Sequence, residues 1–255
     1  MYFSVIILFF CLGAIFGSFY NVVGYRLPRK ESLLYPSSHC TNCNHKLGPF
    51  ELIPILSFLL LGGKCKNCKN KISWFYPIFE LLSGILFALS YVIFGFTFDC
   101  LLSIVFISML LIIIVSDYQT MIIPDSILIV FSILIIVIKY FIGGFEGVGL
   151  SILNGIASFT FMFLIKLLGD FLFKKESMGG GDIKLLGVYG LVLGFPLSVI
   201  SVFIAAIIAL PVSLISIKKN PSHEIPFGPF LAISAIILML SKIELSSILN
   251  IITII

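Results

Sequence analysis

Eight apolar runs constrain the fold of this chain more than any other feature of its sequence. They occupy residues 2–24, 75–96, 99–116, 121–142, 148–169, 183–195, 197–217 and 227–241. A membrane-spanning helix needs about 20 consecutive apolar residues, so most of these runs are long enough to cross a bilayer. The run 183–195 is short for a span, and Phe195-Pro196 at its end indicates a tight turn into the next helix.

The scarcity of charge supports a membrane location over a soluble one. Charged residues make up 11% of the 255 residues and hydrophobic residues 60%, whereas a soluble domain carries about 25% charged residues. We therefore expect an all-α polytopic membrane protein with about eight transmembrane helices. The first run has no basic residue before it and no small-x-small cleavage site after it, which favours a retained helix over a signal peptide.

The positions of lysine and arginine predict the orientation. If the eight runs cross alternately, fourteen of the sixteen basic residues fall on one side of the bilayer, leaving only Lys139 and Lys242 opposite. Cytoplasmic loops carry such an excess of positive residues. We therefore expect segments 25–74, 170–182 and 218–226 to lie in the cytoplasm and both chain ends to lie outside.

Residues 25–74 are the only long polar segment, and they contain two C-x2-C pairs separated by 21 residues. The four cysteines are Cys40, Cys43, Cys65 and Cys68. Two such pairs allow two short loops to offer four thiolates to a tetrahedral Zn²⁺ ion. Disulfides are the alternative, but they are rare in the cytoplasm. We predict a small cytoplasmic domain with a structural zinc, and we expect the neighbouring His39 and His45 to be solvated.

Two aspartates are expected at the cytoplasmic ends of separate helices. Asp117 ends the run LLSIVFISMLLIIIVSD, and Asp182 immediately precedes the run 183–195. Ionisable residues at such positions are candidates for function. The alternatives are a carboxylate that reaches water for Asp117 and a helix cap for Asp182. Two carboxylates within a few Å share one proton, so the ionised one could deprotonate a water while the protonated one polarises a scissile carbonyl.

The residues around the two aspartates suggest supporting roles. Three glycines precede Asp182, and their lack of a Cβ would let a peptide backbone approach closely, although a flexible hinge is the alternative. These are Gly179, Gly180 and Gly181. Asp125 follows Pro124 at the start of the fourth expected helix, which favours stabilisation of a helix N-terminus over a third catalytic acid. Lys184 either tunes Asp182 or faces water.

These patterns leave three classes of function open. The first is an aspartic peptidase that uses Asp117 and Asp182. The second is a proton- or cation-coupled transporter with a zinc-knuckle regulatory loop, which would use the same aspartates to bind ions. The third is a structural membrane subunit of a pilus or secretion machine, which would tolerate the loss of both aspartates.

Several segments, spread in order over nearly the whole chain, resemble the type IV prepilin peptidase family of intramembrane aspartic peptidases of the G-x-G-D type. They are GSFYNVVGYRLP at 17–28, the two C-x2-C pairs, ELIPILSF at 51–58, ISWFYPIFELLSG at 72–84, SDYQTMIIPD at 116–125, ESMGGGDIKLLG at 176–187 and PFGPFLA at 226–232. The resemblance implies that Asp117 and Asp182 are the catalytic pair. It also implies a domain division into a first helix at 1–24, a zinc-binding and methyltransferase-associated domain at 25–74, and a peptidase bundle at 75–255.

The same resemblance implies the substrates and partners. The family cleaves the positively charged leader of prepilins and pseudopilins at the cytoplasmic face of the inner or plasma membrane. Many members also methylate the new N-terminus with S-adenosylmethionine, for which no binding residue is assigned here. The sequence departs from relatives at Phe50-Glu51-Leu52-Ile53-Pro54, where many read Y-D-N-I-P. The expected partners are the lipid bilayer and the type IV pilus or type II secretion machinery, and no nucleic acid is expected.

Overall fold

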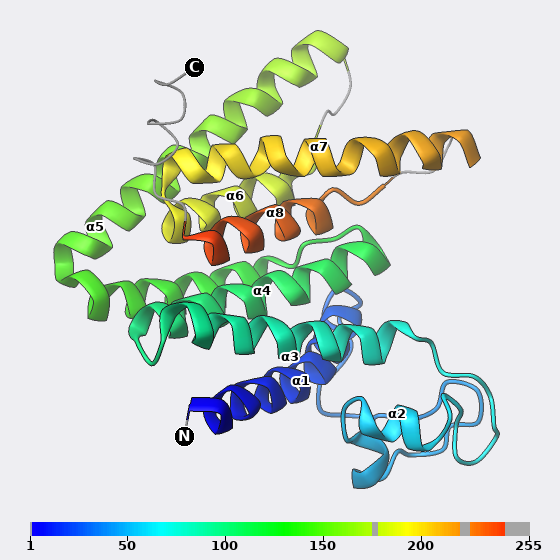
Figure 1. Ribbon diagram of the computed structural model, residues 1–255. Helices are drawn as coiled ribbons and strands as arrows, with labels where there is room; N and C mark the ends of the chain where they lie inside the picture. The colour runs from blue at the N-terminus through cyan, green and yellow to red at the C-terminus, as the bar shows by residue number, and fades with distance from the viewer. Residues whose placement is uncertain (1, 175–177, 220–224, 243–255) are drawn as a thin grey trace. The chain divides into compact units, whose positions relative to one another are not determined.

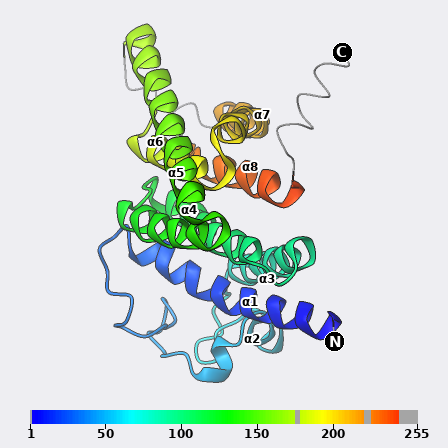
Figure 2. The same cartoon turned by 90° about the vertical axis from the view of Figure 1, so that its left-hand side faces the viewer.

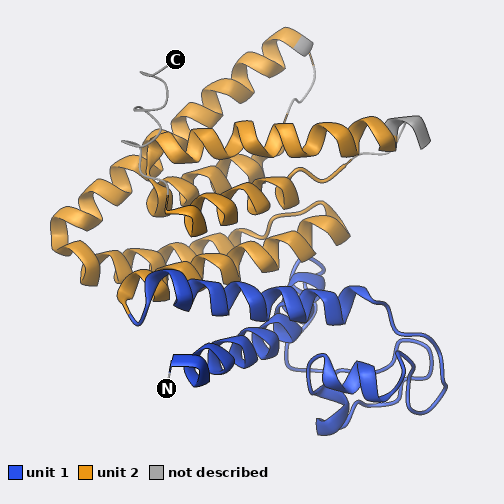
Figure 3. Cartoon of the chain, viewed as in Figure 1, with its two compact units in different colours: residues 1–96 blue, residues 97–255 orange. Residues whose placement is uncertain are grey.

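The computed structural model describes residues 2–174, 178–219 and 225–242. Over these residues the chain is helical, and the described part contains two isolated β-bridges but no strand. The chain divides into two compact units, residues 1–96 and 97–255 (Figure 3). Parts of two segments predicted to be cytoplasmic lie outside the described residues. They are residues 175–177 of the segment 170–182 and residues 220–224 of the segment 218–226.

Two helices form the frame of the first unit, α1 (Tyr2–Arg26) and α3 (Phe75–Phe94). Figure 1 shows them side by side, and glycines allow this close approach. A Cβ on Gly13 would lie 2.5 Å from the carbonyl oxygen of Ser83, and a Cβ on Gly84 would lie 2.8 Å from the Phe10 ring. Small residues at helix interfaces allow this kind of packing where lipid removes the hydrophobic driving force.

The polar segment between α1 and α3 contains a 3-10 turn, η1 (Pro49–Leu52), and a short helix, α2 (Leu56–Leu60). It is joined to the helical frame through Glu80, whose buried carboxylate accepts the N–H of Ile55 at 2.8 Å. Ile55 has a φ of +63°, which is unfavourable for a β-branched residue. The hydrogen bond from Glu80 therefore helps to hold the turn that begins α2.

The second unit contains α4 (Phe98–Thr120), α5 (Asp125–Phe173), α6 (Gly180–Leu193), α7 (Phe195–Lys219) and α8 (Gly228–Ser241). Figures 1 and 2 both show α8 between α4 and α7. α5 packs against α4 and α6. The core of this unit lies along α4, where Phe106, Ile107 and Ile113 are fully buried.

A sharp bend divides α5 into the two helices expected at 121–142 and 148–169. Gly144 has a φ of +61° and a ψ of −154°, outside the helical region, and the ribbon changes direction there in Figure 1. The apolar run begins at residue 121, but Met121 adopts a left-handed φ of +55° and α5 begins at Asp125, directly after Pro124, as expected from the sequence. Hydropathy could not reveal this boundary, since residues 121–123 are as apolar as the helices around them.

Five helices are long and apolar enough to cross a membrane in the part of the chain that the structure describes. They are α1, α3, α4, α5 and α7, with α5 counted as a single element despite its bend. α8 is a shorter apolar helix of 14 residues. The all-α, polytopic membrane fold expected from the sequence is confirmed.

Candidate active site and metal centre

Two loops of matching geometry carry the four cysteines of the first unit. A β-bridge between His39 and Lys46 closes the first loop, and one between Lys64 and Lys71 closes the second. Within each loop the first cysteine's N–H donates to a carbonyl five residues later, at 2.9 Å in both cases. Each loop thus holds its two thiol groups on one side, as a zinc knuckle requires.

The four sulfur atoms meet at one point between the loops. All of them lie within 4.8 Å of one another, and both histidines nearby are excluded from the cluster. The Sγ atoms of Cys40 and Cys68 are 3.8 Å apart, and those of Cys43 and Cys65 are 3.9 Å apart. Four sulfurs about 2.3 Å from a tetrahedral zinc are roughly 3.8 Å from one another. The site therefore fits a metal ion, and the separations are too long for a disulfide.

An asparagine in each loop donates to a sulfur of the other loop. Asn42 Nδ2 lies 3.6 Å from Cys68 Sγ, and Asn67 Nδ2 lies 3.8 Å from Cys43 Sγ. The backbone N–H of Asn70 and then the Asn42 amide lower the pKa of the Cys68 thiol to about 6. These donors favour the thiolate of Cys68, which is the form that binds a metal, whereas burial and the neighbouring sulfurs raise the pKa of the Cys43 thiol to about 11.

His45, which was expected to be a solvated neighbour of the cluster and not a ligand, is partly exposed and contacts Glu51. The ring Nε2 of His45 lies 3.1 Å from Glu51 Oε2, which also accepts the N–H of Gly48 at 2.8 Å. The Gly48 hydrogen bond and then His45 hold the pKa of the Glu51 carboxyl below its usual range. The other oxygen, Glu51 Oε1, is buried and accepts no hydrogen bond from any described residue.

Asp117 lies in the last turn of α4 in the second unit, and its side chain is buried. Its Oδ2 accepts the N–H of Gly228 at 2.9 Å, from the first residue of α8. The helix ends four residues later, where the N–H of Met121 bonds to the Asp117 carbonyl at 2.8 Å. The Ser116 hydroxyl donates to the carbonyl of Ile122, so the chain that leaves α4 folds back towards Asp117.

Asp182 lies in the first turn of α6, which begins at Gly180 after an N-cap at Gly179. A Cβ on Gly181 would lie 3.0 Å from the Ile123 side chain, so this glycine lets the segment that follows α4 approach α6. The Asp117 carboxylate acts electrostatically on Asp182. The two aspartates, from different helices, therefore form one electrostatic system.

One open cavity of about 430 Å³ contains all the site residues expected in the second unit. The residues that line it are Asp117, Met121, Ile122, Ile123, Pro124, Asp125, Gly179, Gly180, Gly181, Asp182 and Lys184. This volume lies within the range of about 300–1,000 Å³ that is typical of ligand-binding pockets. The cavity thus combines the buried carboxylate of Asp117 and the partly buried carboxylate of Asp182 with room for a substrate and for water.

Asp125 and Lys184 form an ion pair at this cavity. Lys184 Nζ lies 2.7 Å and 2.8 Å from the two carboxylate oxygens of Asp125. Both side chains are at least half exposed, so the pair contributes little to stability. The sequence left open whether Lys184 tunes Asp182 or faces water. In the structure it is paired with Asp125.

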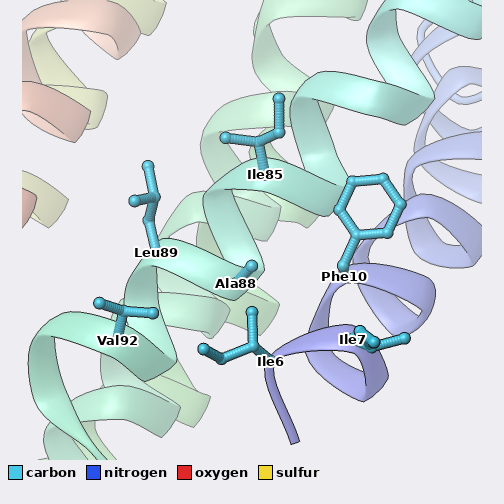
Figure 4. A pocket seen from close by; sticks show the side chains of 7 residues that line it. All are labelled: Ile6, Ile7, Phe10, Ile85, Ala88, Leu89 and Val92. Carbon is cyan, nitrogen blue, oxygen red and sulfur yellow. The ribbon is translucent and has the colours of Figure 1, made fainter. Parts of the chain in front are cut away.

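A second cavity, of about 300 Å³, lies between α1 and α3 in the first unit. Figure 4 shows its lining of Ile6, Ile7, Phe10, Ile85, Ala88, Leu89 and Val92. No polar side chain lines it. It offers no group for hydrolysis or metal binding, so the chemistry of the molecule lies elsewhere.

Sequence reasoning missed one contributor to these sites, Gly228. Gly228 was quoted within PFGPFLA but was not assigned to the aspartate site, and its contact with Asp117 joins residues 111 positions apart. Asn42 and Asn67 lie between the cysteines of each pair, but their donation to the opposite loop depends on how the loops pair. The glycine between two prolines was the only signal for Gly228 in the sequence.

Comparisons with known proteins agree with this arrangement. Residues 11–94 match the family model described as the bacterial peptidase A24 N-terminal domain, and residues 104–214 match the model of the type IV leader peptidase family. The first match contains the cysteine cluster, and the second contains both aspartates. No solved structure matches the chain.

Curated relatives match over most of their length. A prepilin leader peptidase/N-methyltransferase of Bacillus subtilis is 36% identical over 89% of this chain and 91% of its own length. Proteins of the same name from Neisseria gonorrhoeae and Pseudomonas aeruginosa are 31% and 28% identical, over 88% and 90% of this chain and 86% and 88% of their own lengths. The chain therefore belongs to the type IV leader peptidase family.

Proposed function

We propose that this protein cleaves the leader peptide of type IV prepilins and related pseudopilins, with Asp117 and Asp182 as the catalytic pair. One observation carries the assignment of these residues: two carboxylates from helices far apart in sequence line a single cavity. The family match and the names of the relatives support the reaction.

The chemistry follows from two carboxylates that share one proton. The ionised aspartate takes a proton from a water molecule as the water oxygen bonds to the scissile carbonyl carbon. The protonated aspartate gives its proton to the carbonyl oxygen. The C–N bond of the tetrahedral intermediate then breaks as the first aspartate passes its proton to the leaving amine, and the second aspartate takes a proton back from a hydroxyl of the intermediate. Burial of Asp117 strengthens the electrostatic interactions of its carboxylate with neighbouring groups.

The protein is also an N-methyltransferase, which modifies the new N-terminus, and its methyl donor is proposed to be S-adenosylmethionine. The free, buried Oε1 of Glu51 is an acceptor that fits a hydroxyl or ammonium donor of this cofactor. Glu51 would hold and orient the cofactor, which supplies the methyl group when bound. Equilibrium binding of S-adenosylhomocysteine should weaken at least tenfold in Glu51→Gln with zinc content unchanged, and unchanged binding would exclude Glu51.

For the cysteine cluster we propose one structural Zn²⁺, bound by Cys40, Cys43, Cys65 and Cys68. The sulfur geometry and the asparagine donors support it. Four thiolates leave no position for a substrate, so the ion would stabilise the domain and take no part in a reaction.

We also propose that the chain consists of a first helix at 1–24, a zinc-binding domain at 25–74 and a peptidase bundle at 75–255, and that it lies in the cytoplasmic membrane. The excess of lysine and arginine around the cysteine loops supports a cytoplasmic position for them. The partners would be prepilins and the machinery of a type IV pilus or type II secretion system.

A reconstituted assay separates the peptidase from a transporter. Purified protein in liposomes should shorten an added prepilin on a gel without any ion gradient, in the presence of inhibitors of serine and cysteine peptidases. Wild-type protein that leaves the prepilin intact, yet carries protons or cations across the liposome membrane through Asp117 and Asp182, would exclude the peptidase.

A further inference from the structure

The start of α8 supplies one isolated hydrogen-bond donor to the site. The first amides of a helix have no partner within the helix, and here the second residue of α8 is Pro229, which has no N–H. The amides of Phe230 and Leu231 bond to the carbonyl of Phe227. Of the first two residues of α8, only Gly228 therefore has an N–H. This N–H donates to Asp117 Oδ2 at 2.9 Å.

The Asp117 carboxylate also fills the space that a side chain at position 228 would need. A Cβ at this position would lie 2.6 Å from Asp117 Oδ2 and 3.1 Å from its carboxyl carbon. Both distances are shorter than nearly all real Cβ contacts. Any other residue at 228 must displace either the carboxylate or the end of α8. Glycine is thus required here because Asp117 occupies the place of a side chain.

The two aspartates are held differently. Asp117 Oδ2 receives a backbone N–H at the start of a helix, where a negative charge is favoured. Asp182 receives no hydrogen bond on its carboxylate from any residue that the structure describes. The charged groups that share the cavity with Asp117 are Asp182 and Lys184 on α6 and Asp125 at the start of α5, and Lys184 is paired with Asp125.

We infer that Gly228 is a positioning residue for the peptidase reaction, which fixes Asp117 as the ionised member of the pair and leaves Asp182 as the proton donor. This inference rests on the proposed function. Asp117 takes a proton from water as the water oxygen bonds to the scissile carbonyl carbon, and Asp182 gives its proton to the carbonyl oxygen. When the C–N bond breaks, the amine leaves with the proton held by Asp117, and Asp182 takes a proton back from a hydroxyl of the intermediate.

Two changes at one position test this role. Gly228→Ala adds the Cβ that displaces the carboxylate, and exchange of the 228 amide for an ester, made with glycolic acid by cell-free synthesis, removes the donor without adding bulk. Gly149→Ala is the matched control, because Gly149 is exposed on α5 and a Cβ there has no neighbour within 4 Å.

We expect kcat for prepilin cleavage to fall about 100-fold in Gly228→Ala, since a misplacement of 1 Å in a catalytic group costs about that factor. The ester variant should lose at least tenfold in kcat. In both, KM and the binding of a non-cleavable prepilin should stay within threefold of wild type, because the substrate contacts are unchanged. The control should match wild type in all three.

A kcat within threefold of wild type in the ester variant would overturn the inference, as would a loss that appears in KM and prepilin binding alone. If Gly228→Ala fails to fold, which thermal unfolding in detergent would reveal, the ester variant decides the question. Failure of the inference is distinguishable from failure of the proposed function, because in the latter case wild-type protein itself does not cleave prepilin.

Discussion

At the scale of single residues, both sites depend on donors that satisfy negative charge. The cysteine sulfurs receive the side-chain amides of Asn42 and Asn67, and Asp117 receives the amide of Gly228. The cysteines and aspartates were predictable, because their residue type and spacing identify their chemistry. The asparagines of the cysteine loops were predictable as supports for the thiolates, but the sulfur that each one reaches and the Gly228 donor were not, since they depend on the folded chain.

The asparagine donors should tune the affinity for zinc. Asn67→Ala removes the hydrogen bond to Cys43 Sγ, and loss of such an outer contact costs about 10- to 100-fold in metal affinity. Competition with a chromophoric chelator measures the affinity of purified protein. Thr41→Ala changes an exposed residue of the first cysteine loop and should leave the affinity unchanged, and equal affinities in the two variants would show that the amide has no role.

At the scale of helices, hydropathy predicted where the apolar elements lie but not how they end. The boundary at residues 121–124 depends on the left-handed Met121 and on Pro124, and both lie within an apolar stretch. The bend at Gly144 likewise depends on backbone angles that only the sequence Gly143-Gly144 suggested. The position of Asp117 in the cavity follows from the same early end of α4, because the chain then turns back over the aspartate.

The bend in α5 makes Gly144 sensitive to substitution. A φ of +61° with a ψ of −154° is accessible almost only to glycine, and a side chain there costs about 1 to 3 kcal/mol. Gly144→Ala should therefore lower the thermal midpoint of unfolding in detergent. Gly149→Ala, on the same element but with helical angles, is the control, and equal midpoints for both variants would contradict the bend.

At the scale of the whole molecule, the two units separate two kinds of chemistry. The first contains the cysteine cluster and the second contains the aspartates, which parallels the two family models matched along the chain. Composition and charge predicted a multi-pass protein, and they also predict which loops face the cytoplasm. The chemistry of each unit could be read from its motifs, because each motif is contained within one unit.

The predicted orientation can be checked by labelling intact cells. In a parent protein with Cys11 and Cys100 changed to serine, which keeps the four cysteines of the cluster, a cysteine added in place of Phe145 should increase labelling by an impermeant maleimide, and one added in place of Lys174 should not. Both positions are exposed, so the side of the membrane decides the result. Labelling at Lys174 alone would reverse the orientation and place the aspartates on the outer face.

The most direct test of the account is prepilin cleavage by aspartate variants of purified, folded protein. Asp117→Asn and Asp182→Asn preserve the size of each side chain but remove its proton transfer, so each should abolish cleavage. The double variant should be no worse than either single variant, because the pair acts as one unit. Asp125→Asn, which changes only the exposed ion pair with Lys184, should reduce cleavage partially. Near-normal cleavage in either Asp117→Asn or Asp182→Asn would contradict the assignment of the catalytic pair.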